Sequence, residues 1–414
     1  MKVLHVNKFH YRKGGSEAVY FDTAHMLEKR GHQSLFFSME HAENVPCEQS
    51  RYFMPFVDLN ATRGVGKQLK TAVRILYSFD AKKRLAALLD EHKVDVAHLH
   101  NIHHQISPSI LHELKRRNIP VVMTLHDYKM VCPSYSLLAH GLLCAACTGG
   151  TFYHAIQKRC VKGSLAKSAL AAAEMYLHHS MLDIYGLVNV FIAPSLFLKQ
   201  TLANMGFKKQ IVHLPNFIDL AQFAHYSEER SISRRFVYFG RLSAEKGLAT
   251  LLKAVAGLPQ AKLDVIGDGP LRAELEQWTK KHCAERVCFY GHLRGDELWS
   301  RIRKAIAVIV PSEWYENNPL TVIEAFALCV PVIGARIGGI PELVRNGETG
   351  LTFEAGNVEA LTAKLRYAAD NTIGMRQMGV QAQTFVQNDL SAEQHYEKLM
   401  RIYKTDLDEV IKKQ

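Results

Sequence analysis

Short apolar runs alternate with longer amphipathic segments along most of the chain. The segments between the runs have helical spacing, and the one over 16–31 begins with serine and ends with glycine, two residues favoured at helix ends. In the first half the apolar runs predict strands over 2–6, 33–38, 94–100, 120–126 and 188–195. Strands that alternate with helices predict a parallel sheet with helices on both faces.

The second half repeats this pattern. Its apolar runs predict strands over 236–240, 262–267, 287–291, 307–312 and 330–335. Helices are expected near 247–257, 270–283, 295–304 and 319–328. Turn residues at Pro215 and Asn216, followed by a charged stretch, indicate a linker between the halves. We therefore predict an α/β protein with two doubly wound, Rossmann-like domains, 1–195 and 196–394, whose strand ends face a central cleft.

Composition agrees with two globular domains. At 414 residues, of which 48% are hydrophobic, the chain can form two cores. No apolar run approaches the ~20 residues that span a bilayer. The opening MKVLHV indicates a first strand and no signal peptide. We expect a cytoplasmic protein.

The formal net charge of +11 favours an anionic partner. No nucleic acid is expected, because dense basic runs, finger spacing and aromatic-basic RNA signatures are missing. The segment 61–84 combines cations with apolar residues at helical spacing, as interfacial helices do. The residues in question are Val65, Leu69, Val73, Leu76 and Tyr77, with Arg63, Lys67, Lys70, Arg74, Lys82, Lys83 and Arg84. A peripheral contact with the anionic inner face of the cytoplasmic membrane and an ordinary packed surface helix are both open.

The stretch WYENNPLTVIEAF over 314–326 predicts a helix start directly after a strand. Asn318 is a favoured N-cap, and Pro319 is a favoured first helical residue. The free backbone N–H groups of Leu320 and Thr321 then form a site suited to a phosphate or diphosphate.

Two carboxylates flank this anion site, Glu316 before it and Glu324 one turn inside the helix. Carboxylates repel phosphate but accept hydrogen bonds from hydroxyl groups. A ligand with hydroxyls on both sides of its phosphates is a nucleotide sugar. Taken alone, the pair is better explained as a solvated loop acid and a helix acid favoured by the dipole.

Two cations follow the strand at 236–240. Arg241 and Lys246, in FGRLSAEKG, lie at the sheet edge where a ligand of such a fold binds. They could neutralise a leaving diphosphate, although two ordinary surface cations are the alternative.

These motifs occur together in one known family. The chain resembles glycosyltransferase family 4, retaining enzymes of the GT-B fold that use nucleotide sugars. The resemblance extends over nearly the whole chain and is carried by the Gly14-Gly15 loop, GRLSAEKG, VIGDGP, PSEWYENNPLTVIEAFALCVPVIG and GGIPELVRNGETGLTF.

The resemblance implies roles for the donor-site residues. Glu316 contacts the hydroxyls of the donor sugar, and Glu324 contacts the ribose. Arg241 and Lys246 bind the diphosphate, together with the amides of Leu320 and Thr321. Because this positive charge is already present, no catalytic divalent metal is expected.

Further roles implied by the resemblance fall in the first half. The Gly14-Gly15 loop closes over the phosphates, since a backbone without Cβ approaches closely. His126, in TLHDY, lies where relatives carry an active-site histidine that faces the donor sugar or the acceptor. Asp127 either orients that ring or caps the next turn. The last helix, 395–414, returns to pack on the first domain.

By the same resemblance the reaction is a transfer with retention, in which His126, Glu316, Arg241 and Lys246 act by positioning and charge stabilisation. The expected donor is a UDP-linked hexose or N-acetylhexosamine. The expected acceptor is a lipid-linked or surface polysaccharide precursor. A nucleotide-sugar epimerase and a non-catalytic nucleotide-sugar-binding partner in polysaccharide assembly are the alternatives.

Four of the eight cysteines cluster in the pattern C-x11-C-x2-C-x12-C, namely Cys132, Cys144, Cys147 and Cys160. A C-x2-C pair with two outlying cysteines is a familiar zinc arrangement. Disulfides are disfavoured in a cytoplasmic protein. We predict a structural zinc in the insertion 132–160, which resembles insertions of some bacterial exopolysaccharide transferases; four unconnected thiols are the alternative.

Overall fold

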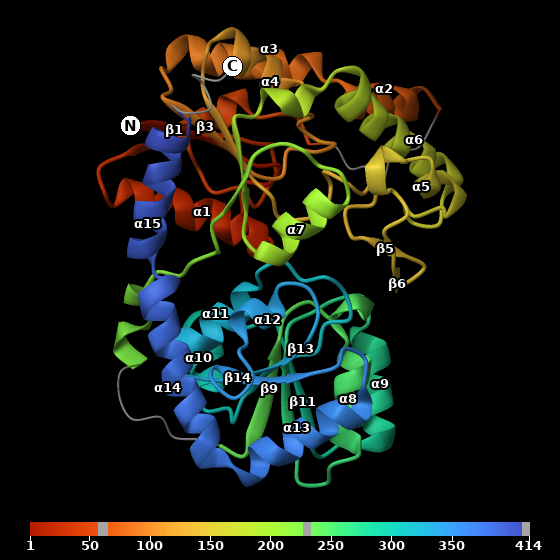
Figure 1. Ribbon diagram of the computed structural model, residues 1–414, viewed down its shortest axis with the longest axis vertical. Helices are drawn as coiled ribbons and strands as arrows, with labels where there is room; N and C mark the ends of the chain where they lie inside the picture. The colour runs from red at the N-terminus through yellow and green to blue at the C-terminus, as the bar shows by residue number, and fades with distance from the viewer. Residues whose placement is uncertain (57–64, 227–232, 408–414) are drawn as a thin grey trace. The chain divides into compact units, whose positions relative to one another are not determined.

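The computed structural model describes residues 1–56, 65–226 and 233–407, with 65–70, 405 and 406 described by their backbone alone. The chain divides into two compact units (Figure 1). The first comprises Met1–Leu214 with Tyr396–Gln414, and the second comprises Pro215–His395. Each unit is built on a six-stranded sheet, and the paired strands of both sheets run parallel.

The sheet of the first unit has the order β2-β1-β3-β4-β7-β8. Its strands are β1 (Lys2–Val6), β2 (Gln33–Phe37), β3 (Val96–Leu99), β4 (Val121–Thr124), β7 (Val190–Ala193) and β8 (Ile211–His213). Its helices include α1 (Gly15–Glu28), α2 (Val65–Leu76), α3 (Phe79–Glu91), α4 (Ile110–Arg116), α6 (Leu165–Met175) and α7 (Leu196–Asn204). The strand order reverses between β1 and β3, and this switch point is where a doubly wound sheet leaves room for a ligand.

The sheet of the second unit has the order β11-β10-β9-β12-β13-β14. Its strands are β9 (Arg235–Phe239), β10 (Lys262–Ile266), β11 (Val287–Gly291), β12 (Val308–Val310), β13 (Val332–Ala335) and β14 (Gly350–Phe353). Its helices include α8 (Leu248–Ala256), α9 (Arg272–His282), α10 (Gly295–Arg303), α11 (Leu320–Ala327), α12 (Ile340–Leu343), α13 (Val358–Asp370) and α14 (Thr372–Asp389). This is the strand order of the dinucleotide-binding fold, with its switch point between β9 and β12.

Side chains of the second sheet alternate between two cores. Phe236 and Tyr238 of β9 pack in one core with α8 and α13, whereas Val237 and Phe239 pack in the other with α11. Figure 1 shows α8 and α13 side by side, in agreement with this core. The alternation follows from the two-residue period of a strand, and it explains why strands buried on both faces are almost continuously apolar.

The ten strands predicted from apolar runs are present, and the prediction missed four short strands of the described residues. These are β8, β14 and the hairpin β5 (Leu138–Ala139) and β6 (Leu142–Leu143). The sequence placed residues 196–214 in the second domain. In the structure β8 pairs with β7, so β8 belongs to the first sheet, and α7 and β8 both belong to the first unit.

The chain returns to the first unit after His395. Tyr396, in α15 (Ala392–Arg401), contacts His32 Nε2 through its hydroxyl at 2.9 Å. Farther along, the Tyr403 hydroxyl lies 2.6 Å from His98 Nδ1 in the core of that unit. The final helical segment therefore supplies part of the first unit's interior.

The basic segment 61–84 is only partly described. Arg63 lies outside the described residues, and Val65, Lys67, Leu69 and Lys70 are described by backbone alone. In the remainder of α2, Ile75 is buried, Val73 is 53% exposed, and the Arg74 guanidinium donates to the Pro55 carbonyl at 3.2 Å. Part of the predicted cationic face thus packs on its own unit.

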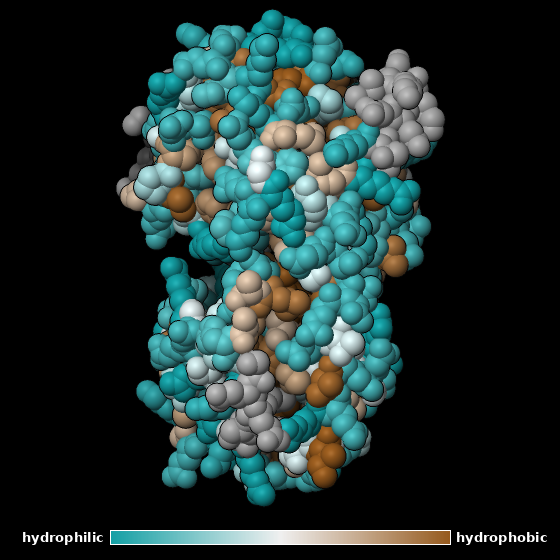
Figure 2. Space-filling view, turned by 90° about the vertical axis from the view of Figure 1, so that its left-hand side faces the viewer, coloured by the Kyte–Doolittle hydropathy of each residue, from teal (hydrophilic) through white to brown (hydrophobic). Residues whose placement is uncertain are grey.

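Among the described residues, no helix has the length and apolar character required to cross a bilayer. The face in Figure 2 carries mostly hydrophilic residues, with apolar ones in smaller groups.

Candidate functional site

The site in the second unit lies at its topological switch point. The segment after β9 carries Arg241 and Lys246, and the segment after β12 carries Glu316 and leads into α11. Ligands of open α/β sheets bind at the carboxyl ends of strands at this point. The fold brings two of these predicted residues into contact, because Lys246 Nζ lies 2.6 Å from Glu316 Oε1.

The Glu316 carboxylate is buried and charged. Lys246 Nζ and Ser312 Oγ both donate to Oε1, each at 2.6 Å, which leaves Oε2 for a further donor. Burial acts to raise the pKa of Glu316, but the charge of Lys246 and the hydrogen bonds from Lys246 and Ser312 outweigh it, so that the pKa lies below its usual range. The carboxylate is therefore ionised at neutral pH and can accept a ligand hydroxyl.

Two glycines hold the backbone at Glu316. Gly339 N–H donates to the Glu316 carbonyl at 2.7 Å. Gly338 has φ +60°, and a Cβ there would collide with the Glu316 carbonyl oxygen and lie 2.6 Å from its nitrogen. Only glycine allows this approach, so the GGIPE segment fixes the loop that carries the acid.

The start of α11 differs from the sequence prediction. The helix begins at Leu320 with Pro319 as its N-cap residue, so the prediction of an Asn318 cap is wrong. Asn318 Oδ1 accepts from the Asn216 N–H at 3.0 Å, and its carbonyl accepts from Asn216 Nδ2 at 2.7 Å. Leu320 and Thr321 remain the first helical residues, whose N–H groups have no partner within the helix. The helix N-terminus is thus suited to an anion.

The other predicted residues surround this helix start. The Arg241 side chain is exposed, and it forms no ion pair with a carboxylate of the described residues. The Lys246 ammonium also lies 5.2 Å from the centre of the Trp314 ring. Glu324 is half-buried on α11, four residues after Leu320 and so on the same helical face.

In the first unit, Gly14 and Gly15 are exposed at the start of α1. Gly14 is the N-cap residue, with φ −167°, and a Cβ there would meet only Glu17 Oε2 at 3.6 Å. An extended residue in ordinary contact can carry any side chain. Nothing described within this unit therefore requires glycine at position 14.

His126 follows β4 and is half-buried. Its Nε2 lies 2.8 Å from His100 Nδ1, and the two rings stack with centres 5.1 Å apart. Burial, and then the charge of Lys8, lower the pKa of His126 to about 3, so the imidazole is neutral at neutral pH. Asp127 Oδ1 accepts from the Lys129 N–H at 2.9 Å, so Asp127 caps the turn.

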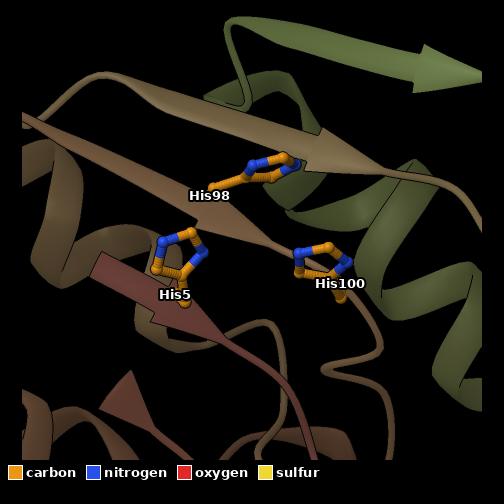
Figure 3. A group of neighbouring side chains, drawn as sticks. All are labelled: His5, His98 and His100. Carbon is orange, nitrogen blue, oxygen red and sulfur yellow. The ribbon is translucent and has the colours of Figure 1, made fainter. Parts of the chain in front are cut away.

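Sequence reasoning missed a buried histidine cluster behind His126 (Figure 3). His98 lies on β3 and His100 directly follows it, and both side chains project to the same side. His5 lies beside His98 because β1 and β3 pair with His5 opposite His98. Nitrogen atoms of the three rings lie within 4.8 Å of one another. The period of two in VAHLH could have predicted the shared face of His98 and His100, but not the alignment of His5.

Hydroxyl groups already engage one of the three rings. His98 Nδ1 contacts the Tyr403 hydroxyl at 2.6 Å, and His98 Nε2 contacts Thr124 Oγ1 at 2.7 Å. His5 has no hydrogen-bond partner in the described structure, and burial lowers its pKa to about 3. We interpret the cluster as neutral core histidines that pack behind His126.

We expect His5→Leu to reduce the loss of stability in acid. The unfolded chain binds a proton at His5 below its ordinary pKa of 6.5, whereas the folded chain does so only near 3. The stability that His5 contributes is therefore complete above pH 6.5 and is lost as the pH falls towards 3. The free energy of unfolding, measured with urea, should fall between pH 7.5 and pH 5 by about 2 kcal/mol less in the variant than in the wild type.

His25→Leu is the matched control, because His25 is exposed on α1 of the same unit. Equal pH dependence in His5→Leu and wild type would contradict the interpretation. Loss of a bound metal from His5→Leu would contradict it as well.

Comparison with known proteins identifies the family. A model described as "Glycosyl transferases group 1" matches residues 226–385, and "Glycosyltransferase Family 4" matches residues 13–222, which is 210 of the 414 residues. The chain belongs to glycosyltransferase family 4. Its family-4 region contains Gly14, Gly15 and His126, and its group 1 region contains Arg241, Lys246, Glu316 and Glu324.

Curated relatives of this glycosyltransferase differ in what they transfer. Sulfoquinovosyl transferase SQD2 of Arabidopsis thaliana is 38% identical over 133 residues, 31% of this chain and 25% of the relative. Glycogen synthase of Mycobacterium tuberculosis is 32% identical over 168 residues, 39% of this chain and 40% of the relative. These two matches span less than half of each relative. N-acetyl-alpha-D-glucosaminyl L-malate synthase of Bacillus anthracis is 22% identical over 392 residues, 94% of this chain and 93% of the relative.

Solved structures show the same fold over nearly the whole transferase. Sucrose-phosphate synthase of Thermosynechococcus elongatus has a TM-score of 0.71 at 18% identity, covering 97% of this chain and 98% of its own. HepE of Anabaena, in complex with UDP and glucose, has a TM-score of 0.67 at 16% identity, covering 98% of this chain and 100% of its own. The fold is GT-B, with two Rossmann-like parallel-sheet domains.

Proposed function

We propose that this glycosyltransferase is a retaining enzyme that moves a hexose or N-acetylhexosamine from a UDP-linked donor to a lipid-linked or surface polysaccharide precursor. The observation that carries the proposal is the ion pair between the buried Glu316 and the half-buried Lys246, at 2.6 Å, at the switch point of the second sheet. A buried, charged acid that already accepts from Lys246 and Ser312 through one oxygen is suited to accept a ligand hydroxyl beside a phosphate site.

The donor diphosphate would rest on the N-terminus of α11. The amides of Leu320 and Thr321 would bind its phosphates, together with the side chains of Arg241 and Lys246. The positive charge of these two side chains stabilises the diphosphate as it leaves, so we expect transfer without a catalytic divalent metal. Glu316 would bind the sugar, and Glu324, on the same helix face as Leu320, would bind the ribose.

The first unit would supply His126 and the Gly14-Gly15 turn. By the family resemblance this turn would lie against the donor phosphates, where a backbone without Cβ can approach closely. A neutral imidazole at His126 can donate or accept one hydrogen bond, to a hydroxyl of the donor sugar or of the acceptor.

The proposed reaction uses no protein nucleophile. The acceptor oxygen forms its bond to the anomeric carbon on the face from which the diphosphate departs. The bond from that carbon to the phosphate oxygen breaks, and the acceptor proton passes to the departing diphosphate. The side chains act by holding this geometry and by neutralising the leaving charge.

The choice of UDP is supported by the HepE complexes, which contain UDP or UDP-glucose. A lipid-linked acceptor and a peripheral place on the inner face of the cytoplasmic membrane are supported by the net charge of +11 and the basic segment 61–84. Cosedimentation tests the membrane contact, with vesicles that contain anionic lipid compared with neutral vesicles. Equal binding to both kinds of vesicle would contradict the proposed contact with an anionic membrane.

A donor screen tests the function. UDP-glucose, UDP-galactose, UDP-N-acetylglucosamine and GDP-mannose are incubated with the enzyme, with and without brief chelation, and nucleoside diphosphate is measured. Release of UDP that persists after chelation supports the proposal. Interconversion of the sugars would indicate an epimerase, and binding without turnover would indicate a non-catalytic partner.

A further inference from the structure

The four cysteines of the insertion 132–160 lie around one cavity, although their sulfur atoms are not as closely grouped as the ring nitrogens of the histidine cluster. Cys132, Cys144, Cys147 and Cys160 all line a single cavity of about 10 Å³. This is the volume of roughly one water-sized sphere. They reach it from different parts of the insertion: Cys144 follows β6, Cys147 precedes a short 3-10 turn, and Cys160 follows a four-residue helix. All eight cysteines of the chain are free thiols in this structure.

The insertion contains little regular secondary structure. Its regular elements are the two-residue strands β5 and β6, a three-residue 3-10 turn and the four-residue α5 (His154–Gln157). The apolar cluster that includes Cys147 has only three other buried members, namely Phe152, Ala172 and Met175. Such small cores rarely stabilise a segment without a cross-link or a metal.

Backbone strain is concentrated in the same segment. Among the described residues, ten other than glycine have positive φ, and five of these lie in or next to the insertion, namely Tyr135, Leu137, His140, Arg159 and Lys162. Each such conformation costs about 1–3 kcal/mol and persists only when its surroundings fix it. A strong interaction at the cavity would offset this cost.

We propose that Cys132, Cys144, Cys147 and Cys160 bind one structural zinc ion. Four thiolates are the donor set of closed zinc sites, and the C-x2-C pair supplies two of the ligands from one turn. His154 also lines the cavity, but its Nδ1 contacts Gln157 Oε1 at 3.0 Å, and four thiolates already complete a tetrahedron. Zinc binding at such sites contributes directly to folding free energy.

The site fixes the segment that leads out of β4. Lys129, three residues before Cys132, donates from Nζ to Glu174 Oε2 at 2.8 Å, and both side chains are buried. Zinc would hold the insertion between this ion pair and α7, whose C-cap residue Met205 also lines the cavity. The proposal concerns structure and does not depend on the transfer reaction.

The test is the zinc content of the purified full-length chain, measured by inductively coupled plasma mass spectrometry without a metal-affinity step. We expect about one zinc per chain in the wild type and nearly none in Cys144→Ser and Cys147→Ser. Cys283→Ser, at a buried cysteine of the second unit, and His5→Leu, in the histidine cluster, should keep the ion.

Cobalt substitution of the wild type keeps the test decisive if the cysteine variants do not fold. We expect the intense visible and near-ultraviolet absorption of tetrahedral cobalt thiolate. Folded wild-type protein without metal, iron in place of zinc, or disulfides among the four cysteines would overturn the proposal. Zinc kept by Cys147→Ser and lost from His5→Leu would also overturn it.

Discussion

Glu316→Gln should lower donor turnover on the order of 10²-fold. The substitution keeps the shape of the side chain and removes its charge. The carboxylate that accepts from Lys246 and Ser312 is replaced by an amide that binds a sugar hydroxyl more weakly and no longer neutralises the ammonium. Initial rates of UDP release and the KM for the donor, measured together, show whether transition-state binding is lost.

Glu348→Gln is the matched control, since Glu348 is an exposed acid of the same unit paired with Arg345. It should turn over donor at the wild-type rate. Thermal unfolding of both variants separates lost chemistry from lost folding, because removing one partner of a partly buried ion pair also lowers stability. A Glu316→Gln enzyme that is as active as Glu348→Gln would remove the assignment of the acid to the donor sugar.

Arg241→Gln should weaken UDP binding by about tenfold or more, since hydrogen bonds to charged groups contribute about 1.5–3 kcal/mol. The guanidinium is exposed and forms no ion pair with a described carboxylate, so it is available for a diphosphate. Calorimetric titration with UDP at two ionic strengths gives the affinity. The decrease in UDP affinity at the higher ionic strength should be larger for the wild type than for the variant.

Arg345→Gln is the matched control. It removes the same charge from the same unit, at a residue far from Arg241 in the sequence that pairs with Glu348. It should leave UDP affinity near the wild-type value. If the two arginine variants bound UDP equally well, the effect would come from net charge alone, and Arg241 would have no direct contact with the diphosphate.

Local sequence signals predicted most of the fold and the segments that meet at the switch point of the second sheet. Strands buried on both faces, such as β9 and β13, were visible because nearly every residue is apolar. β8 was missed because it has only three residues, all of them half-buried, and the last of them is the polar His213. Arg241, Lys246 and Glu316 could be placed because each follows a predicted strand.

Tertiary partners account for what the sequence could not show. Asparagine is a favoured N-cap residue, but both oxygens of Asn318 accept hydrogen bonds from Asn216, which lies 102 residues away in the sequence. The need for glycine at position 338 is visible only once the Glu316 backbone lies against it. The cysteine spacing suggested that the four side chains lie near one another, but only the coordinates show the cavity that they line and the strained backbone around it.

The returning helical segment has a consequence for synthesis on the ribosome. His98, in the interior of the first sheet, has the Tyr403 hydroxyl as a partner, and that tyrosine is 305 positions later in the chain. Residues 1–214 emerge from the ribosome long before Tyr403 is synthesised. The His98 imidazole in the nascent first sheet therefore lacks the Tyr403 hydroxyl while residues 215–395 are translated. Domains commonly fold in order of emergence. Here the earliest one to emerge is the last to be finished.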